Sequence, residues 1–529
     1  MTKLCVANPR SLFVRLLLLS LGCRTTLAVG QQCAQDQPYC WDPTAMAKCS
    51  GVAPDGCRTG HCFKESTCCH GGGPKCNSTH PYCFDDQQPQ GYRCNNVGAG
   101  GCCGTGICME DSSCKGPGGP KPPSSDTSSS SPSSIACPKA EAWPKMPSNI
   151  MDYNGIAWPT ACFNDTEEQH FFIIGDWGGV FPHTTFNNRH TPIQPDIDPN
   201  AQMLVAGRMA AIAQTSKPKF VINVGDNIYP GGIGVPGQCN PVEGRFDDQG
   251  QAGIVFRGTF EDVYKGPGLD GVEWWGVLGN HDFGGNVYST HWDQMIYYTW
   301  HSEDSRWLTP ALYWSRRVQY NNFSADFFFV DTNICDAQPP WVDPGHNMCN
   351  GVHNSIPPLE PWQLFCNGTS ITNPTTCGAF FRDLWNTQKV WLEAKLEASD
   401  ADWQIVVTHY PPIFEPCMSE LWKSAFGKYG VDLYISGHTH QQSFYYKEEP
   451  YGDTAWIISG GGGGITSEIP PDMYGNDDGY GFVDVVISKA QLEVIMYSHG
   501  GVEGATIVRR RAIVTPRARA AANDVEVVV

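Results

Sequence analysis

The sequence predicts an α/β fold for the main part of the chain, preceded by a small disulfide-rich module. Two observations favour this organisation. From residue 171 onward, short apolar runs rich in β-branched and aromatic residues alternate with helical patterns, as is typical of strands buried on both faces of a sheet. The chain has 24 cysteines among 529 residues, and most of them precede residue 115, where apolar periodicity is almost absent.

The expected strands and helices of the main domain follow in order along the chain. Apolar runs predict strands at 171–174, 220–224, 274–278, 404–408 and 431–436. Helical patterns predict helices at 200–214, 386–398 and 418–426, which gives a β-α-β order through the middle of the domain. After residue 440 few helices are expected, and four further runs predict antiparallel strands at 442–447, 455–459, 482–487 and 492–497.

Composition and the first residues indicate where the protein is found. The formal net charge of −19 argues against nucleic acid or an anionic membrane surface as a partner. The cysteine content is too high for a reducing compartment. Residues 1–28 resemble a signal peptide, with a positive start and an apolar run too short to span a bilayer. We therefore expect a secreted, extracellular protein without a transmembrane segment. Glycosylation sequons, each weak evidence alone, lie at Asn77, Asn164, Asn322 and Asn367.

Residues 33–114 form a cysteine-rich module with two internal repeats. The stretch 37–42 recurs at 80–85, and the stretch 57–62 recurs at 103–108. Each copy is too small for a hydrophobic core, so disulfides are expected to hold it. A zinc site is the alternative, and the irregular cysteine spacing argues against it. A Pro/Gly/Ser-rich linker at 115–136 separates this module from the main domain.

The aromatic residues of the module have two interpretations. They could form a platform that binds a glycan or a cell-wall surface, or they could simply pack on the neighbouring disulfides. The residues concerned are Tyr39, Trp41, Tyr82, Phe84 and Tyr92. The sequence leaves both interpretations open.

Five predicted strands of the main domain end in polar residues that can bind metal ions. Glycine precedes Asp176, Asp226, Asn280 and His438, and it permits a sharp turn at the carboxyl end of a strand, where open α/β sheets bind ligands. A single Gly-Asp pair after a strand is usually an ordinary turn, but five such ends in a row argue against coincidence. Together they supply Asp176, Asp226, Tyr229, Asn280, His281, His409, His438 and His440. This is too many ligands for one ion and about enough for two, with Asp226 bridging ions about 3.5–4 Å apart.

These five motifs resemble the calcineurin-like metallophosphoesterases and, within them, the purple acid phosphatases of the tartrate-resistant type. Most members of the wider family have a histidine two residues after the first aspartate, where this chain has Gly178. Purple acid phosphatases have a tyrosine three residues after the second aspartate, and Tyr229 stands there. The resemblance covers about residues 168–497. It implies a catalytic domain at 165–500 with a four-layer αββα β-sandwich of two mixed sheets.

The same resemblance implies a mechanism. Fe(III) would be held by Asp176, Asp226, Tyr229 and His440. A divalent ion, Fe, Zn or Mn, would be held by Asp226, Asn280, His409 and His438. A metal-bound hydroxide would then attack a phosphomonoester, as in an acid phosphatase. His281 would bind the phosphate and protonate the leaving group. One departure is that no second substrate-side histidine follows His409, and Glu415 is the only titratable group of similar reach.

Three other segments carry expectations. In tartrate-resistant enzymes, the loop that corresponds to 333–385 lies over the active site, and the resemblance implies a disulfide between Cys335 and Cys417. The five glycines at 460–464 predict a flexible turn by default. In the resembled family a small-residue turn after this strand sits near the metals, so a close approach of the backbone is the alternative. The basic tail at 509–529 is expected to begin with a last strand and to end disordered.

Two other functions are weighed against the phosphatase. Another binuclear phosphoesterase, such as a phosphodiesterase or nucleotidase, is disfavoured by Tyr229 and Gly178. A binding protein with a vestigial phosphatase domain would be indicated by lost metal ligands, but every ligand position is filled.

Overall fold

The computed structural model describes residues 141–517, with gaps at 180–188, 234–250, 286–287, 289, 302–304, 343–345, 355–370, 372, 415–416 and 418. It also describes Cys137 and short strands between residues 39 and 109. The chain divides into two units, Met1–Ser129 and Ser130–Val529, and each is described by itself.

The first unit contains two three-stranded sheets. Its strands are β1 (Tyr39–Trp41), β2 (Ser50–Gly51), β3 (His61–Phe63), β4 (Tyr82–Phe84), β5 (Cys94–Asn96) and β6 (Ile107–Met109). The strand orders are β2-β1-β3 and β5-β4-β6, and all pairs are antiparallel. In the strand register, Cys40 of β1 lies opposite Cys62 of β3, and Cys83 of β4 lies opposite Cys108 of β6. The two sheets thus have the same plan, which parallels the repeat in the sequence.

The second unit is built on two seven-stranded sheets, and the first has the order β11-β10-β9-β8-β18-β19-β20. Its strands are β8 (Gln169–Ile174), β9 (Phe220–Asn223), β10 (Glu273–Gly276), β11 (Trp307–Leu308), β18 (Gly481–Ile487), β19 (Leu492–Ser498) and β20 (Val508–Val514). Strands β8 to β11 are parallel, whereas β18, β19 and β20 extend the sheet by antiparallel pairing. The expected last strand is β20; the expected disordered end falls on residues 518–529, outside the described residues.

The second sheet has the order β16-β17-β15-β14-β13-β12-β7. Its strands are β7 (Ile156–Phe163), β12 (Trp314–Tyr320), β13 (Ser324–Phe329), β14 (Trp403–Val407), β15 (Leu433–Ser436), β16 (Gln442–Tyr445) and β17 (Ala455–Ser459). The prediction of antiparallel strands after residue 440 is wrong for one pair, since β17 runs parallel to β15. The reason is that β16, between β15 and β17 in the sequence, runs in the opposite direction to β17, so that β17 again runs in the direction of β15.

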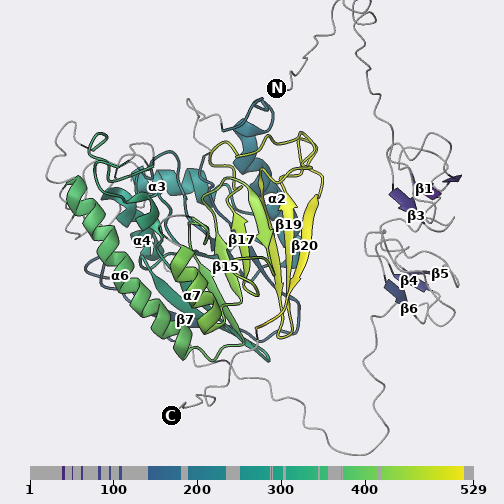
Figure 1. Ribbon diagram of the computed structural model, residues 1–529, viewed down its shortest axis with the longest axis horizontal. Helices are drawn as coiled ribbons and strands as arrows, with labels where there is room; N and C mark the ends of the chain where they lie inside the picture. The colour runs from purple at the N-terminus through teal and green to yellow at the C-terminus, as the bar shows by residue number, and fades with distance from the viewer. Residues whose placement is uncertain are drawn as a thin grey trace, which may run out of the picture. The chain divides into compact units, whose positions relative to one another are not determined.

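The helices lie on the outer faces of the two sheets (Figure 1). The three longest in the described part of the chain are α2 (Ala201–Ser216), α6 (Pro374–Ala398) and α7 (Ser419–Tyr429). Helix α6 begins well before the predicted residue 386, because Asn373 caps it in a capping box and Pro374 occupies its first turn. Shorter elements are η2 (Asp198–Asn200), α3 (Gln251–Phe256), the π-helical turn η3 (Arg257–Glu261), η4 (Thr290–Trp292), α4 (Asp293–Tyr297), η5 (Tyr298–Trp300) and η6 (Asn333–Asp336).

Alternation along the strands creates the four layers. On β8, Phe171 and Ile173 belong to the core between the two sheets, whereas Phe172 and Ile174 belong to the core that includes α2. A third core joins the outer face of the second sheet to α6 and α7. The predicted α/β class and the four-layer αββα sandwich are therefore confirmed.

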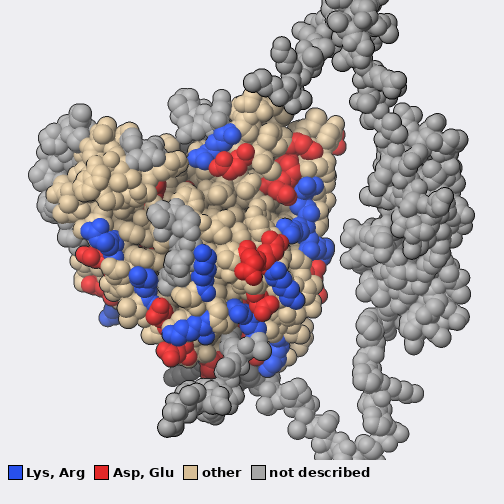
Figure 2. Space-filling model, viewed as in Figure 1, with Lys and Arg blue, Asp and Glu red and all other residues tan. Residues whose placement is uncertain are grey.

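The surface of the second unit carries charges of both signs. On the face shown in Figure 2, Lys and Arg side chains lie interspersed with Asp and Glu side chains. Asn164 and Asn322 of the predicted sequons are exposed, whereas Asn77 and Asn367 lie outside the described residues. Of the helices in the described part of the chain, none combines the length and the apolar character that a bilayer span requires.

Candidate metal centre

The predicted ligands come together where the two sheets meet. Asp176, Asp226 and Asn280 follow β8, β9 and β10 of the first sheet, while His409 and His438 follow β14 and β15 of the second. The common edge is thus shared by both sheets, a point that the order of the strands in the sequence does not reveal.

One group of oxygen and nitrogen atoms surrounds the hydroxyl of Tyr229. Its Oη atom lies 2.9 Å from Oδ2 of Asp226, 3.2 Å from Oδ1 of Asp176 and 3.2 Å from Nε2 of His440. Atoms that bind one ion at about 2.0–2.2 Å lie about 3 Å apart when they subtend a right angle at it. These four side chains are therefore spaced as ligands of one ion, and we call them the Tyr229 group.

A second group surrounds the side-chain oxygen of Asn280. Its Oδ1 atom lies 3.1 Å from Nε2 of His409 and 3.3 Å from Nδ1 of His438. Nε2 of His409 is also 3.4 Å from Oδ1 of Asp226. We call Asp226, Asn280, His409 and His438 the Asn280 group.

Asp226 belongs to both groups, with one carboxylate oxygen directed to each. Oδ2 faces Tyr229 and Oδ1 faces His409. Asp176, Asp226 and His409 are all buried, and each offers a ligand atom within 4.8 Å of the others. A carboxylate shared in this way can bridge two ions.

The backbone is unusual at three of the proposed ligands. Asp176, Asp226 and His438 have φ angles of 56°, 52° and 70°. Non-glycine residues rarely adopt such angles, and they cluster at functional sites where the surroundings enforce them. The turns at the strand ends thus direct these side chains inward at a cost to local stability.

Glycine precedes two ligands because no larger residue fits there. A β-carbon on Gly279 would lie 2.2 Å from Oδ1 of Asp226, and one on Gly437 would lie 2.4 Å from Oδ2 of Asp176. The carboxylates therefore occupy the space next to these glycines. This explains the Gly-Asn and Gly-His pairs that the sequence shows.

Gly178 leaves no room for the side chain of any larger residue. A β-carbon there would lie 1.8 Å from the carbonyl oxygen of Asn227, and the φ angle is 67°. The N–H of Tyr229 donates to the carbonyl of Gly178 at 3.2 Å. The close approach of residues 227–229 to Gly178 thus both excludes a side chain there and positions the backbone of Tyr229.

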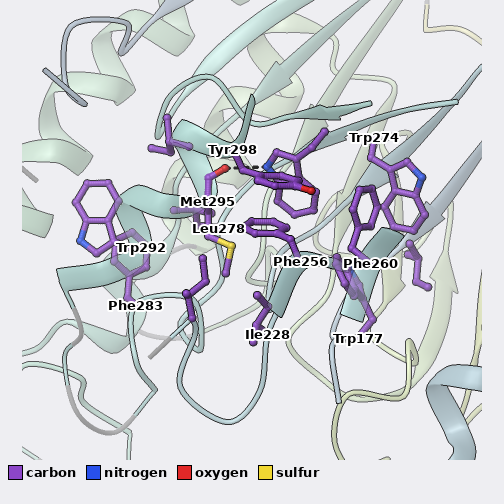
Figure 3. Packing of buried hydrophobic residues seen from close by; sticks show 14 of the residues in the cluster. Trp177, Ile228, Phe256, Phe260, Trp274, Leu278, Phe283, Trp292, Met295 and Tyr298 are labelled. Atoms are coloured by element: carbon purple, nitrogen blue, oxygen red, sulfur yellow. Dashed lines mark hydrogen bonds between the residues drawn. The ribbon is translucent and has the colours of Figure 1, made fainter. Parts of the chain in front are cut away.

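A buried tryptophan anchors the first of these turns (Figure 3). The Nε1–H of Trp177 donates to Oδ1 of Asn223 at 3.0 Å. Its ring packs against Phe260 and Trp274, with centroid distances of 5.9 and 5.8 Å. Because Trp177 directly follows Asp176, this packing limits the movement of that carboxylate.

Burial and charge act on the protonation of the central groups. Burial opposes ionisation of Asp226, but His409 and His281 outweigh it and hold the pKa of Asp226 below its usual range. Burial, with Asp176 and Asp226, raises the pKa of Tyr229 well above its usual value. Two buried carboxylates beside a half-buried phenol form a donor set that fits a hard, highly charged cation.

His281 adjoins both groups without belonging to either. Its backbone N–H donates to Oδ1 of Asp226 at 2.8 Å, and its Nδ1 lies 2.5 Å from the carbonyl oxygen of Pro230. Since a carbonyl can only accept, Nδ1 carries the proton in the neutral ring and Nε2 remains as the second functional atom. The ring lies 4.4 Å from that of Tyr229, between centroids.

Several supporting residues were missed in the sequence. Nδ1 of His409 lies 2.8 Å from the carbonyl oxygen of Val224, which leaves Nε2 for an ion. Asp282 accepts from the backbone N–H groups of Asn227 and Gly279, both at 2.9 Å. The order Gly-Asn-His-Asp could have indicated Asp282, since the residue follows two site residues directly.

Glu468 and Arg189 had no signal in the sequence. Oε1 of Glu468 lies 3.4 Å from Nδ1 of His440 and accepts from Arg189 at 2.8 Å. His440 and Arg189 lower the pKa of Glu468 to about 2, against the effect of burial. The glycine turn before Glu468 approaches the centre, as the resemblance suggested, since Gly464 N–H donates to the carbonyl of Asp176 at 2.8 Å.

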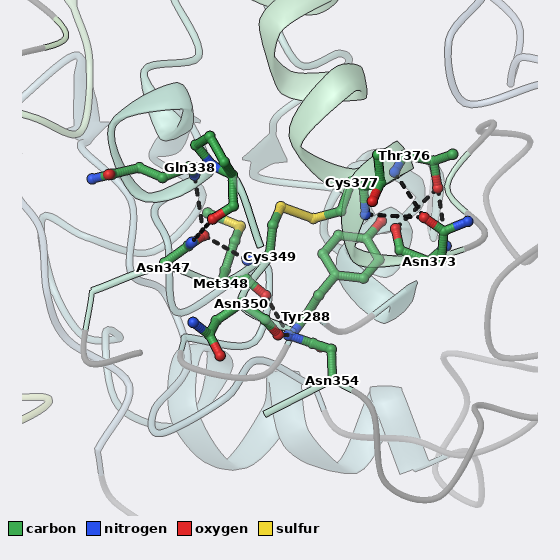
Figure 4. Close-up of a disulfide and its surroundings, with 12 residues drawn as sticks. Tyr288, Gln338, Asn347, Met348, Cys349, Asn350, Asn354, Asn373, Thr376 and Cys377 are labelled. Carbon is green, nitrogen blue, oxygen red and sulfur yellow. Dashed lines mark hydrogen bonds between the residues drawn. A yellow bond between two sulfur atoms is a disulfide. The ribbon is translucent and has the colours of Figure 1, made fainter. Parts of the chain in front are cut away.

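Two disulfides organise the insert between β13 and α6. The pairing of Cys335 with Cys417 that the resemblance implied is present, and a second disulfide joins Cys349 to Cys377. Around the second disulfide, asparagine side chains bind backbone groups of the insert (Figure 4). Phe414, close to Cys417, lies 4.9 Å from the ring of His438. Glu415 lies outside the described residues.

The family profile described as "Calcineurin-like phosphoesterase" matches residues 170–442, slightly more than half of the chain. Tartrate-resistant acid phosphatase type 5 of Mus musculus is 25% identical over 356 residues, which cover 64% of this chain and 88% of that protein. Purple acid phosphatase 4 of Arabidopsis thaliana is 27% identical over 343 residues, covering 63% of this chain and 80% of that protein. Among solved structures, the inner-membrane-complex anchor GAP50 of Plasmodium is 17% identical, with a TM-score of 0.41 over 66% of this chain and 90% of that chain.

Proposed function

The chain belongs to the calcineurin-like phosphoesterase family, and from that premise we propose that it is an acid phosphatase with a binuclear metal centre that hydrolyses phosphomonoesters. The family assignment confirms the resemblance predicted from the five strand-end motifs. Its similarity to tartrate-resistant and purple acid phosphatases supports the choice among the activities of the family.

One observation carries the proposal. The two oxygens of Asp226 face two separate groups of ligand atoms, with Tyr229 in one group and His409 in the other. A structural salt bridge or an ordinary turn needs no such division. A phenol among carboxylates is the donor set of a hard cation, which favours Fe(III).

The residues of each group would hold one ion. We assign Fe(III) to the Tyr229 group, formed by Asp176, Asp226, Tyr229 and His440. We assign a divalent Fe, Zn or Mn ion to the Asn280 group, formed by Asp226, Asn280, His409 and His438. When bound, such ions neutralise phosphate charge and lower the pKa of water.

His281 is assigned the role of binding the phosphate and protonating the leaving alkoxide. Its Nδ1 is engaged by Pro230, so Nε2 is the atom that would donate to the substrate. In this assignment the backbone N–H of His281, which donates to Asp226, holds the catalytic ring at a fixed distance from the bridging carboxylate.

The remaining assignments concern the whole chain. We propose that the protein is secreted after removal of residues 1–28 and is glycosylated at Asn77, Asn164, Asn322 and Asn367. The linker at 115–136 would separate the catalytic domain at 165–500 from the cysteine-rich module at 33–114. For that module we propose a glycan or cell-wall ligand. Its two small sheets have the same strand order, which supports a binding unit that occurs twice.

The test is the visible absorption spectrum of the purified, full-length protein beside its Tyr229→Phe variant. We expect a broad charge-transfer band in the wild type that the variant lacks. A phosphomonoester and a phosphodiester are assayed in parallel, and the monoester should be preferred.

A colourless wild type that cleaves the diester faster would replace the proposal by another binuclear phosphoesterase. A colourless wild type with neither bound metal nor activity would leave a binding protein, with the cysteine-rich module as its functional part.

A further inference from the structure

A chain of contacts leads from the surface to the Tyr229 group through residues that no strand-end motif contains. Arg189 donates through Nη1 to Oε1 of Glu468 at 2.8 Å. The same oxygen lies 3.4 Å from Nδ1 of His440. On the other side of the ring, Nε2 of His440 is 3.3 Å from Oδ1 of Asp176.

In this series of contacts, the surroundings of the Nδ1 atom of His440 are unusual. It is buried, and among the described residues it has no hydrogen-bond partner of normal geometry. The distance of 3.4 Å to Glu468 is within ion-pair range and longer than a usual N–H···O bond. A histidine that binds a metal through one ring nitrogen normally gives its other N–H to an acceptor, often a carboxylate. Glu468 is the carboxylate in that place.

The position of Glu468 does not depend on its side chain alone. Its backbone N–H donates to the carbonyl oxygen of His440 at 3.0 Å. This bond keeps the two residues side by side when the side chain is changed. Variants of Glu468 can therefore alter the contact with Nδ1 while the backbone tie persists.

The ion pair between Arg189 and Glu468 contributes little to folding. The two side chains are 28% and 36% exposed, and pairs of this exposure contribute between 0 and about 1 kcal/mol. Loss of a carboxylate that orients a metal-binding histidine, in contrast, typically lowers metal affinity by about 10- to 100-fold. A substitution of Glu468 would therefore change mainly the metal affinity if the residue orients His440, and at most slightly the folding stability if it only pairs with Arg189.

We propose that Glu468 is a positioning residue for the metal ion of the Tyr229 group. It accepts the Nδ1–H of His440, which fixes the tautomer that leaves Nε2 free for the ion, and it adds negative charge behind the ring. Arg189 holds the carboxylate of Glu468 in this orientation. The proposal rests on the proposed function, since it requires an ion among the four ligands of this group.

The test compares metal affinity among full-length variants purified with their ions. Competition with a chelator, followed by elemental analysis, gives the affinity for each of the two ions. In Glu468→Ala, we expect the affinity for one ion to fall by about 10- to 100-fold and that for the other to stay unchanged. Glu468→Gln, whose amide oxygen can still accept the N–H, should lie between this variant and the wild type.

The matched control is Glu493→Ala. Glu493 on β19 also pairs with an arginine, Arg511 on the edge strand β20, at 2.6 Å, with side chains 30% and 43% exposed. Its replacement should leave both affinities unchanged. In addition, Arg189→Met should weaken binding of the same ion, but should have no further effect when Glu468 is already alanine.

The outcomes separate this proposal from the proposed function. A wild type that holds two ions, beside a Glu468→Ala variant with unchanged affinity for both, overturns the positioning role and leaves the phosphatase intact. A wild type that holds no ion overturns both. The energy of the visible charge-transfer band gives a second readout, since a merely structural role of Glu468 would not shift it.

Discussion

The carbonyl oxygen of Asn227 lies 1.8 Å from the point that a β-carbon on Gly178 would occupy. The backbone therefore fills the space that any side chain at position 178 would need, and the chain has glycine there. Tyr229, two residues after Asn227, directs its hydroxyl to Asp176, Asp226 and His440. The backbone segment that excludes a side chain at Gly178 thus leads directly to Tyr229.

Replacing Gly178 by alanine should destabilise the fold. The positive φ angle alone costs about 1–3 kcal/mol for a non-glycine residue, and the contact with Asn227 adds to this. Thermal unfolding measures the change. Gly207→Ala is the control, because a β-carbon on Gly207 of α2 meets nothing within 4 Å and alanine favours a helix. A Gly178→Ala variant as stable as the Gly207→Ala variant would contradict the steric argument.

The division of Asp226 between two groups predicts different metal losses. Asp226→Ala should lose both ions, because each group loses an oxygen. Asn280→Ala should lose only the ion beside His409, since Asn280 Oδ1 contacts only the Asn280 group. Elemental analysis of the purified variants decides the matter. If Asp226→Ala loses only one of the two ions, as Asn280→Ala is expected to do, Asp226 does not bridge them.

The site was predictable from sequence because its ligands stand at strand ends with local signals. Gly279 and Gly437 are required by the carboxylates beside them, and so the motifs are visible in one sequence. Glu468 was not predictable, since it meets His440 only through the return of the chain after β17. The helical pattern predicts a start at residue 386, whereas α6 begins at Pro374, where Asn373 and Pro374 are strong start signals.

Replacing His281 by alanine should lower kcat without removing the metals. A group that only transfers a proton contributes about 10²- to 10⁴-fold, and His281 belongs to neither ligand group. The pH–rate profile should lose the limb that reports the acid. His353→Ala is the control, since His353 is exposed in the insert. A variant with normal kcat and profile would move the acid to another residue, with Glu415 the first to examine.

The two disulfides of the insert should differ in their contribution to stability. Cys335–Cys417 spans 82 residues and Cys349–Cys377 spans 28, so in the chain-entropy account the first contributes about 1 kcal/mol more. Paired Cys→Ser variants compared by denaturant unfolding measure this. Loss of the first should also raise KM, because Phe414 beside His438 would no longer be held by Cys417. A smaller effect for the longer loop would contradict the account.

A partly buried ion pair away from the site should make the fold more stable in acid. Nδ1 of His170 on β8 lies 2.9 Å from Oδ1 of Asp484 on β18. Burial opposes protonation of His170, but Asp484 and Glu168 outweigh it, so the pKa of His170 is raised above its usual 6.5. Burial also raises the pKa of Asp484 above its usual value, against the effect of His170.

Both shifts act in the same direction. A raised pKa in the folded state gives stability that is fully present below the unfolded value, here 6.5 for the histidine, and is lost as the pH rises through the folded value. A charge-assisted hydrogen bond contributes about 1.5–3 kcal/mol. His170→Gln should therefore lower the melting temperature more at pH 5 than at pH 8.5, because the charge contribution of His170 is lost as the pH rises through its raised folded pKa. An equal decrease at both values would show that the pair acts by packing and not by charge.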